Sequence, residues 1–111
     1  AIGTRTDHTL ANIFMLKKLL DKGVEAIIAD EKNEIRIINK SIRLKREEGC
    51  FISLLPLNGS ARGVTISGFY YPLVNATLEV GSSWGVSNIF TENEAQVTLE
   101  EGYLLVIKSW D

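Results

Sequence analysis

The N-terminal part of the chain has the hydrophobic spacing of an amphipathic helix. Its hydrophobic positions recur about every three or four residues and are Leu10, Ile13, Phe14, Met15, Leu16, Leu19 and Leu20. We predict a turn and a helix within residues 3–23, with Thr6 or Asp7 as the N-cap and Gly23 ending the helix in a left-handed conformation. So broad a hydrophobic face needs a partner surface, which we expect a different domain to supply.

After Gly23 the pattern changes to short hydrophobic segments, several of them alternating with polar residues and most bounded by turn signals. We expect strands within residues 24–30, 34–40, 42–45, 50–55, 64–66, 76–80, 95–99 and 103–107. Pro56 is expected to stop one strand, residues 58–60 and 101–102 to form turns, and the continuous hydrophobic run 103–107 to be buried on both faces. The sequence therefore predicts a mainly β protein, an antiparallel β-sandwich preceded by one N-terminal α-helix that packs outside it.

Composition narrows the class of protein. The 111 residues fit one domain, and a net charge of -2 without a basic stripe argues against nucleic acid as a partner. The single cysteine, Cys50, favours a reducing compartment, and we expect it to be a buried apolar filler. The sequence shows neither a signal peptide nor a run long enough for a membrane span, so a cytoplasmic location is expected. The start at Ala1 without Met predicts a piece of a longer protein.

Residues 81–88 (GSSWGVSN) form a stretch with almost no aliphatic side chains between two strand-like segments. Two glycines, three hydroxyls, one amide and one indole suit the lip of a small-molecule pocket. The same composition also suits an ordinary solvated loop. From the residues alone, both interpretations stay open.

Evidence for catalysis is sparse in the residues themselves. Arg5, Asp7 and His8 can form an anion site at a helix start. The residue types alone favour the structural explanation, in which Asp7 caps the helix, Arg5 pairs with it and His8 is exposed. A Ser-His-Asp set cannot be argued from the single histidine, and the sequence has no phosphate-binding glycine loop and no Cys/His metal spacing. We therefore assign no catalytic and no metal-binding residue.

Several stretches, taken in order, resemble one enzyme family. Residues 3–12 (GTRTDHTLAN) look like the GxRxDHxLAN turn and helix of thiamine pyrophosphokinases. Residues 63–65, Gly68, 71–73 and 81–88 resemble the vitamin B1-binding β domain of that family, and residues 104–109 are similar to its last strand. The resemblance implies that residues 1–23 belong to or border the catalytic domain and that residues 24–111 form a thiamine-binding β-sandwich.

The family transfers a diphosphoryl group from ATP to the hydroxyl of thiamine and releases AMP, with Mg²⁺. The resemblance implies a thiamine diphosphokinase whose ATP and Mg²⁺ bind mainly outside this chain, so that the chain alone is inactive. It also implies a homodimer with thiamine between subunits. A non-enzymatic β-sandwich for small-molecule binding or dimerisation is the alternative.

The resemblance also implies roles for individual residues. Ser87 and Asn88 match the serine and asparagine that line the thiamine site, and Tyr103 falls where some members carry an aromatic that stacks on the substrate. Thiamine is a cationic aromatic, which an aromatic face attracts. The further thiamine-binding residues implied are Ser82, Ser83, Trp84 and His8, with Arg5 and Asp7 near the diphosphoryl side. Ile89 stands where the family pattern has an acidic residue.

Overall fold

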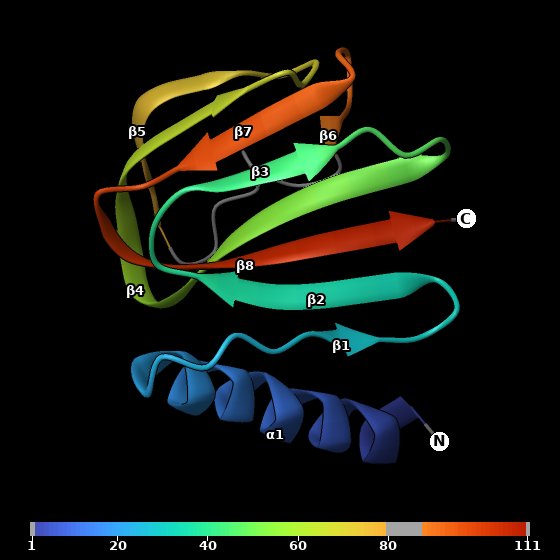
Figure 1. Cartoon of the computed structure of the whole chain (residues 1–111). Coiled ribbons are helices and arrows are strands. Elements are labelled where there is room, and N and C mark those ends of the chain that lie inside the picture. The colour runs from blue at the N-terminus through green and yellow to red at the C-terminus, as the bar shows by residue number, and fades with distance from the viewer. Residues whose placement is uncertain (1, 80–87, 111) are drawn as a thin grey trace.

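The computed structural model describes residues 2–79 and 88–110, with side chains described for residues 11–57, 59–79 and 88–110. One helix, α1 (Ile2–Asp21), precedes the strands and lies beneath them (Figure 1). The strands are β1 (Ile28–Ala29), β2 (Asn33–Ile38), β3 (Ile42–Lys45), β4 (Cys50–Ser67), β5 (Leu73–Leu78), β6 (Asn88–Ile89), β7 (Glu94–Thr98) and β8 (Glu101–Trp110). The predicted mainly β architecture with one N-terminal helix is confirmed.

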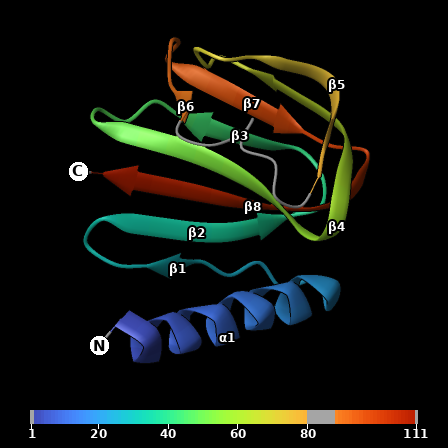
Figure 2. The ribbon, with the colours of Figure 1, turned by 180° about the vertical axis from the view of Figure 1, so that it is seen from behind.

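All the pairings between these strands are antiparallel, in the order β1-β2-β8-β4-β7-β3, with β5 and β6 also paired to β4. The first half of β4 pairs with β8 and β6, and its second half pairs with β5 and β7. The long strand β4 therefore joins two sheets, which curl over each other (Figures 1 and 2). We call them the first sheet (β1, β2, β8, β6 and the start of β4) and the second sheet (β3, β7, β5 and the end of β4).

Alternation along the strands builds two hydrophobic clusters. The inner cluster lies between the sheets and includes Ile52, Val64 and Val97, which are completely buried. The outer cluster lies between the first sheet and α1 and includes Ile13 and Leu16 of the helix with Ile37 and Leu105 of the sheet. In β8, Leu104 faces inward and Leu105 faces α1, so the prediction of a strand buried on both faces is confirmed.

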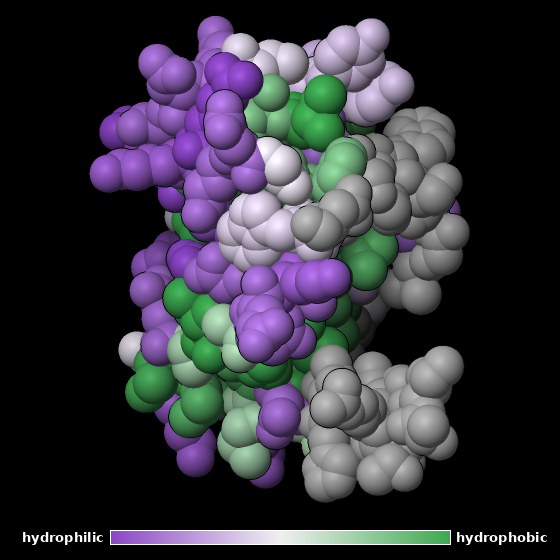
Figure 3. Space-filling view, turned by 90° about the vertical axis from the view of Figure 1, so that its right-hand side faces the viewer, coloured by the Kyte–Doolittle hydropathy of each residue, from purple (hydrophilic) through white to green (hydrophobic). Residues whose placement is uncertain are grey.

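The outer cluster corrects the expectation that a different domain covers the helix. Ile13 and Leu16 are buried by the chain's own sheet, because the odd-numbered residues of β2 and β8 present a second hydrophobic face. Phe14 and Met15 remain about half exposed. Figure 3 shows hydrophobic side chains in the lower half of the molecule, at the level of α1 and β1, and hydrophilic ones at the upper left.

The two ends of α1 differ in how well local signals predict them. At the C-terminus, the Val24 amide donates to the Leu19 carbonyl and the Gly23 amide to the Leu20 carbonyl, with Gly23 at φ 80°. This is the predicted glycine-terminated end. At the N-terminus the helix begins at Ile2, so the predicted turn and N-cap at Thr6 or Asp7 are wrong. A capping preference is worth only about 1 kcal/mol, which does not prevent the helix from starting earlier. The first 23 residues also contain no proline that would interrupt the helix.

The strand that begins at Cys50 continues through Pro56 and residues 58–60, which corrects the predicted stop and turn. Pro56 pairs with Leu104 of β8, and the other side of β4 has no described strand partner there, so its missing amide costs no sheet bond. Between Leu57 and Arg62 the register with β8 shifts. The glycine-containing segment is thus a bulge at which β4 bends from the first sheet to the second. Another correction concerns residues 24–30, of which only β1 is strand.

Candidate functional site

Asn88, the first residue of β6, is the one buried polar residue among those with described burial, at 4% exposure. Its Oδ1 accepts from the backbone amides of Tyr71 (3.0 Å) and Ile89 (3.0 Å), and its Nδ2 donates to the Tyr71 carbonyl (2.7 Å). The side-chain amide thus satisfies both backbone groups of Tyr71. We call this arrangement the Asn88 clamp.

The Asn88 clamp fixes the turn that follows β4. The Tyr70 amide donates to the Ile89 carbonyl and the Thr91 amide to the Gly68 carbonyl, so the segment 68–71 is tied to β6 along its length. Phe69 and Phe90 pack with ring centroids 5.2 Å apart and continue the contact into the inner cluster. Asn88 therefore positions the backbone of the turn 68–71.

Tyr103 lies elsewhere, on the outer face of the first sheet. Its hydroxyl donates to Asp21 Oδ1 at 2.5 Å, and the ammonium of Lys17 lies 4.7 Å from its ring centroid. Lys17 Nζ also bonds Asp21 Oδ2 at 2.9 Å. These three residues form a polar cluster between the end of α1 and the start of β8, which we call the Tyr103 cluster.

The three groups of the Tyr103 cluster shift one another's pKa. The Tyr103 hydroxyl and the Lys17 ammonium both stabilise the Asp21 carboxylate and lower its pKa. The hydrogen bond to Asp21 raises the pKa of Tyr103, and the same carboxylate raises the pKa of Lys17. At neutral pH the cluster therefore holds one carboxylate, one ammonium and one neutral phenol.

We expect Asp21 to make the free energy of unfolding depend on pH in the acidic range. Because its pKa is lowered in the folded chain, its contribution is present above the ordinary carboxyl pKa of about 4 and is lost as the pH falls through the folded value. The difference in unfolding free energy between wild type and Asp21→Asn should shrink between about pH 6 and pH 3, measured by urea unfolding. Glu31→Gln, at an exposed position, is the control. A difference that stays constant over this range would contradict the assignment.

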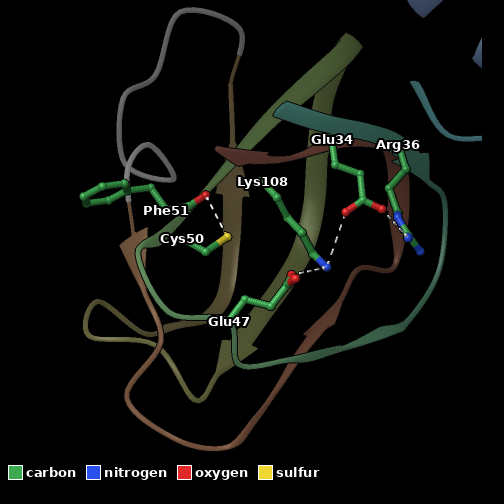
Figure 4. Close-up of polar contacts among 6 residues, drawn as sticks. All are labelled: Glu34, Arg36, Glu47, Cys50, Phe51 and Lys108. Atoms are coloured by element: carbon green, nitrogen blue, oxygen red, sulfur yellow. Dashed lines mark hydrogen bonds and ion pairs between the residues drawn. The ribbon is translucent and has the colours of Figure 1, made fainter. Parts of the chain in front are cut away.

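A second charged network lies at the end of the inner face of the first sheet. Lys108 of β8 sits opposite Glu34 of β2 and is only 13% exposed, with its Nζ 2.9 Å from Glu47 and 3.6 Å from Glu34. Arg36 bonds Glu34 at 3.3 Å, so the carboxylate bridges two cations (Figure 4). Nearby Cys50 is buried, as predicted, and burial raises the pKa of its thiol. This network pairs its charges with one another and serves the fold.

The structure does not bring all the predicted site residues together. Asn88 pairs with Ile52, whereas Tyr103 pairs with Leu57, five residues further along β4 and about 16 Å away along the strand. Arg5, Asp7 and His8 belong to the N-terminal half of α1, which lies at the same end of the molecule as the C-terminal end of β8 (Figure 1). Their side chains are outside the described residues. Ser82, Ser83, Trp84 and Ser87 also lie outside the described residues.

Reasoning from the sequence missed Lys17 and Asp21. Their spacing of four along a helix is a recognisable signal for an ion pair. Nothing local links them to Tyr103, which is 82 positions away from Asp21. No local pattern links Tyr71 to Asn88 either, because the two residues are 17 positions apart.

The described side chains offer no magnesium site. Among residues 11–57, 59–79 and 88–110, no group of three or more His, Cys, Asp or Glu side chains can hold a metal ion. In the described part of the chain, no helix has the length and hydrophobicity to cross a membrane.

Fold and side chains together define a class: an antiparallel β-sandwich with a helix on its outer face and a lysine ammonium over the ring of a half-buried tyrosine on that face. The family model described as thiamin pyrophosphokinase, vitamin B1 binding domain, matches residues 39–104. The chain belongs to this family.

Relatives agree with this assignment. Over 111 residues the chain is 30% identical to thiamine pyrophosphokinase from Bacillus subtilis strain 168, covering 98% of this chain and 52% of that protein. The crystal structure of the thiamine pyrophosphokinase from Bacillus subtilis matches with a TM-score of 0.91 at 28% identity, covering 96% of this chain and 51% of that one. The enzyme from Geobacillus thermodenitrificans matches with a TM-score of 0.84 at 28% identity, covering 96% and 49%. The chain spans about half the length of these relatives.

Proposed function

We propose that this chain is the thiamine-binding portion of a thiamine pyrophosphokinase, which transfers a diphosphoryl group from ATP to the thiamine hydroxyl and releases AMP. The observation that carries the proposal is the family match over residues 39–104 on a fold that matches thiamine pyrophosphokinase along 96% of the chain. The reaction needs a nucleotide and Mg²⁺ to stabilise the charge that spreads over the transferred group. The described side chains do not fit that metal, which supports placing the ATP and Mg²⁺ sites mainly outside them. We propose on this basis that the isolated chain is inactive.

Within this function we assign the thiamine contacts to two separate surfaces. Tyr103 supplies an aromatic face that already carries a cation in this structure, which supports its binding of a cationic aromatic. Asn88 holds the Tyr71 backbone, and its Nδ2 has a second N–H with which to donate to a ligand. We also assign Ser82, Ser83, Trp84 and Ser87, which lie outside the described residues, to the same wall of the thiamine site as Asn88.

The distance between Asn88 and Tyr103 supports a site shared between two subunits. Two patches offset by about 16 Å along β4 on one chain can serve thiamine sites that each include a second copy's surface. We therefore propose a homodimer in which His8 of α1 contributes to thiamine binding and Arg5 and Asp7 lie near the diphosphoryl side. Residues 1–23 border the nucleotide-binding domain in this proposal. The single cysteine supports a cytoplasmic location.

The hydrophobic face of α1 does not discriminate between the proposed enzyme and a non-enzymatic binding or dimerisation module. A free-standing module can have such a face, because Ile13 and Leu16 pack on the chain's own sheet. The reaction itself separates the two functions.

The full-length protein that contains this chain should convert thiamine and Mg-ATP to thiamine diphosphate and AMP in equal amounts. Chromatography of both products with time provides the measurement. The same protein without thiamine is the control, and AMP formed there would report ATP hydrolysis. Thiamine binding without either product would indicate the non-enzymatic module.

A further inference from the structure

We propose that Lys17 is an internal competitor for the cation-binding face of Tyr103, so that a cationic aromatic ligand stacks there only after the Lys17 side chain has left the ring. The proposal rests on the proposed function in one respect, the assignment of Tyr103 to thiamine. It adds a residue of α1 that sets the affinity for the substrate.

The position of Lys17 is that of a bound cation. Its ammonium lies 4.7 Å from the centre of the Tyr103 ring, inside the range of about 6 Å in which a cation is attracted to an aromatic face. A thiazolium or pyrimidine ring stacked on the same face would occupy the volume that this ammonium fills. Two positive charges so close would also repel each other, so the two occupants exclude each other.

Asp21 holds both partners of this contact. One carboxylate oxygen accepts from the Tyr103 hydroxyl and the other binds the Lys17 ammonium. When Lys17 leaves, the oxygen at 2.9 Å loses its cation while the ring stays fixed through its hydroxyl. A positively charged ligand can then replace the lost charge, whereas a neutral ligand cannot. The cluster thereby favours a cation over an uncharged analogue of the same shape.

Lys17 is free to move because it lies at the surface. Its side chain is 24% exposed and that of Asp21 is 41% exposed, and surface ion pairs of this kind hold their partners weakly. Lysine also has four rotatable bonds through which its ammonium can swing into water while the helix backbone stays in place. Displacement therefore requires no change in the fold.

The test is equilibrium titration of thiamine into the full-length protein and its Lys17→Ala variant. Removal of the competitor should tighten thiamine binding about two- to fivefold, the size of an exposed cation–aromatic contact. The matched control is Lys18→Ala, which removes the same charge from the neighbouring, exposed position of α1. It should leave the dissociation constant unchanged, and thermal unfolding of both variants reports whether the fold is intact.

A second pair of variants separates this proposal from the function on which it rests. Tyr103→Leu should weaken thiamine binding, and adding Lys17→Ala to it should then have no effect, because the competed face is gone. Weakened binding in Tyr103→Leu together with unchanged binding in Lys17→Ala would overturn the competitor and leave the function standing. Unchanged binding in Tyr103→Leu would overturn both the assignment of Tyr103 and the competitor. Absence of thiamine binding by the wild type would overturn the proposed function as well.

Discussion

Replacing Gly68 with alanine should lower the free energy of unfolding by about 2–4 kcal/mol. Gly68 ends the strand–turn junction after β4 with φ 85°, where a side chain is strained. A Cβ atom there would lie 2.7 Å from the Glu94 carbonyl oxygen and 2.9 Å from Ala95 Cα. Both neighbours are backbone atoms of β7, so they cannot swing aside without breaking the pairing between β4 and β7. Urea unfolding followed by circular dichroism measures the loss.

Gly49→Ala is the matched control for this prediction. Gly49 has a similar φ of 68°, but a Cβ atom there would meet nothing within 4 Å. Its replacement should cost only the backbone strain, about 1–2 kcal/mol. Equal losses at the two positions would show that the close approach of β7 to Gly68 does not matter.

Replacing Asn88 with alanine should lower the free energy of unfolding by about 1–3 kcal/mol, the cost of leaving buried polar groups unpaired. The Asn88 clamp satisfies the amide and carbonyl of Tyr71 and the amide of Ile89. Alanine keeps the strand but removes all three bonds. Amide hydrogen exchange at Tyr71 should speed up together with the loss of stability seen in urea.

Asn93→Ala provides the comparison for Asn88→Ala. Asn93 is exposed, and its described hydrogen bond uses its backbone carbonyl, which alanine retains. Its replacement should change the unfolding free energy by less than about 0.5 kcal/mol. If Asn88→Ala were equally mild, the Asn88 clamp would not stabilise the turn.

The local sequence pattern predicted an element correctly where the segment's own residues determine its structure. Strand β3 matches the predicted range 42–45, because Ile42 and Leu44 alternate with exposed basic residues over its whole length. The end of α1 was predictable because a glycine at a left-handed position carries its own capping bonds. The double-sided burial of β8 followed from an unbroken hydrophobic run.

Tertiary contacts account for what the sequence could not predict. Pro56 breaks a strand only where its amide is needed, and no described strand pairs with that side of β4 at Pro56. The burial of α1 depends on a second hydrophobic face of the first sheet. The alternation of hydrophobic residues does not indicate which element packs against that face. The same holds for the candidate site: Asn88 was predicted as a ligand contact, but its clamp on Tyr71 exists only after residues 71 and 88 meet.

Equilibrium titration of thiamine into the full-length protein tests directly whether this chain forms part of a thiamine site. The titration is made for the wild type, Ser87→Ala and Ser41→Ala. Loss of one hydrogen-bonding hydroxyl at the proposed wall should weaken thiamine binding about two- to tenfold in Ser87→Ala. Ser41, an exposed serine in the β2–β3 turn, should tolerate the same change without effect. Saturable thiamine binding with this difference between the two serines is the predicted result. No binding by the wild type would contradict the assignment of this chain to a thiamine site.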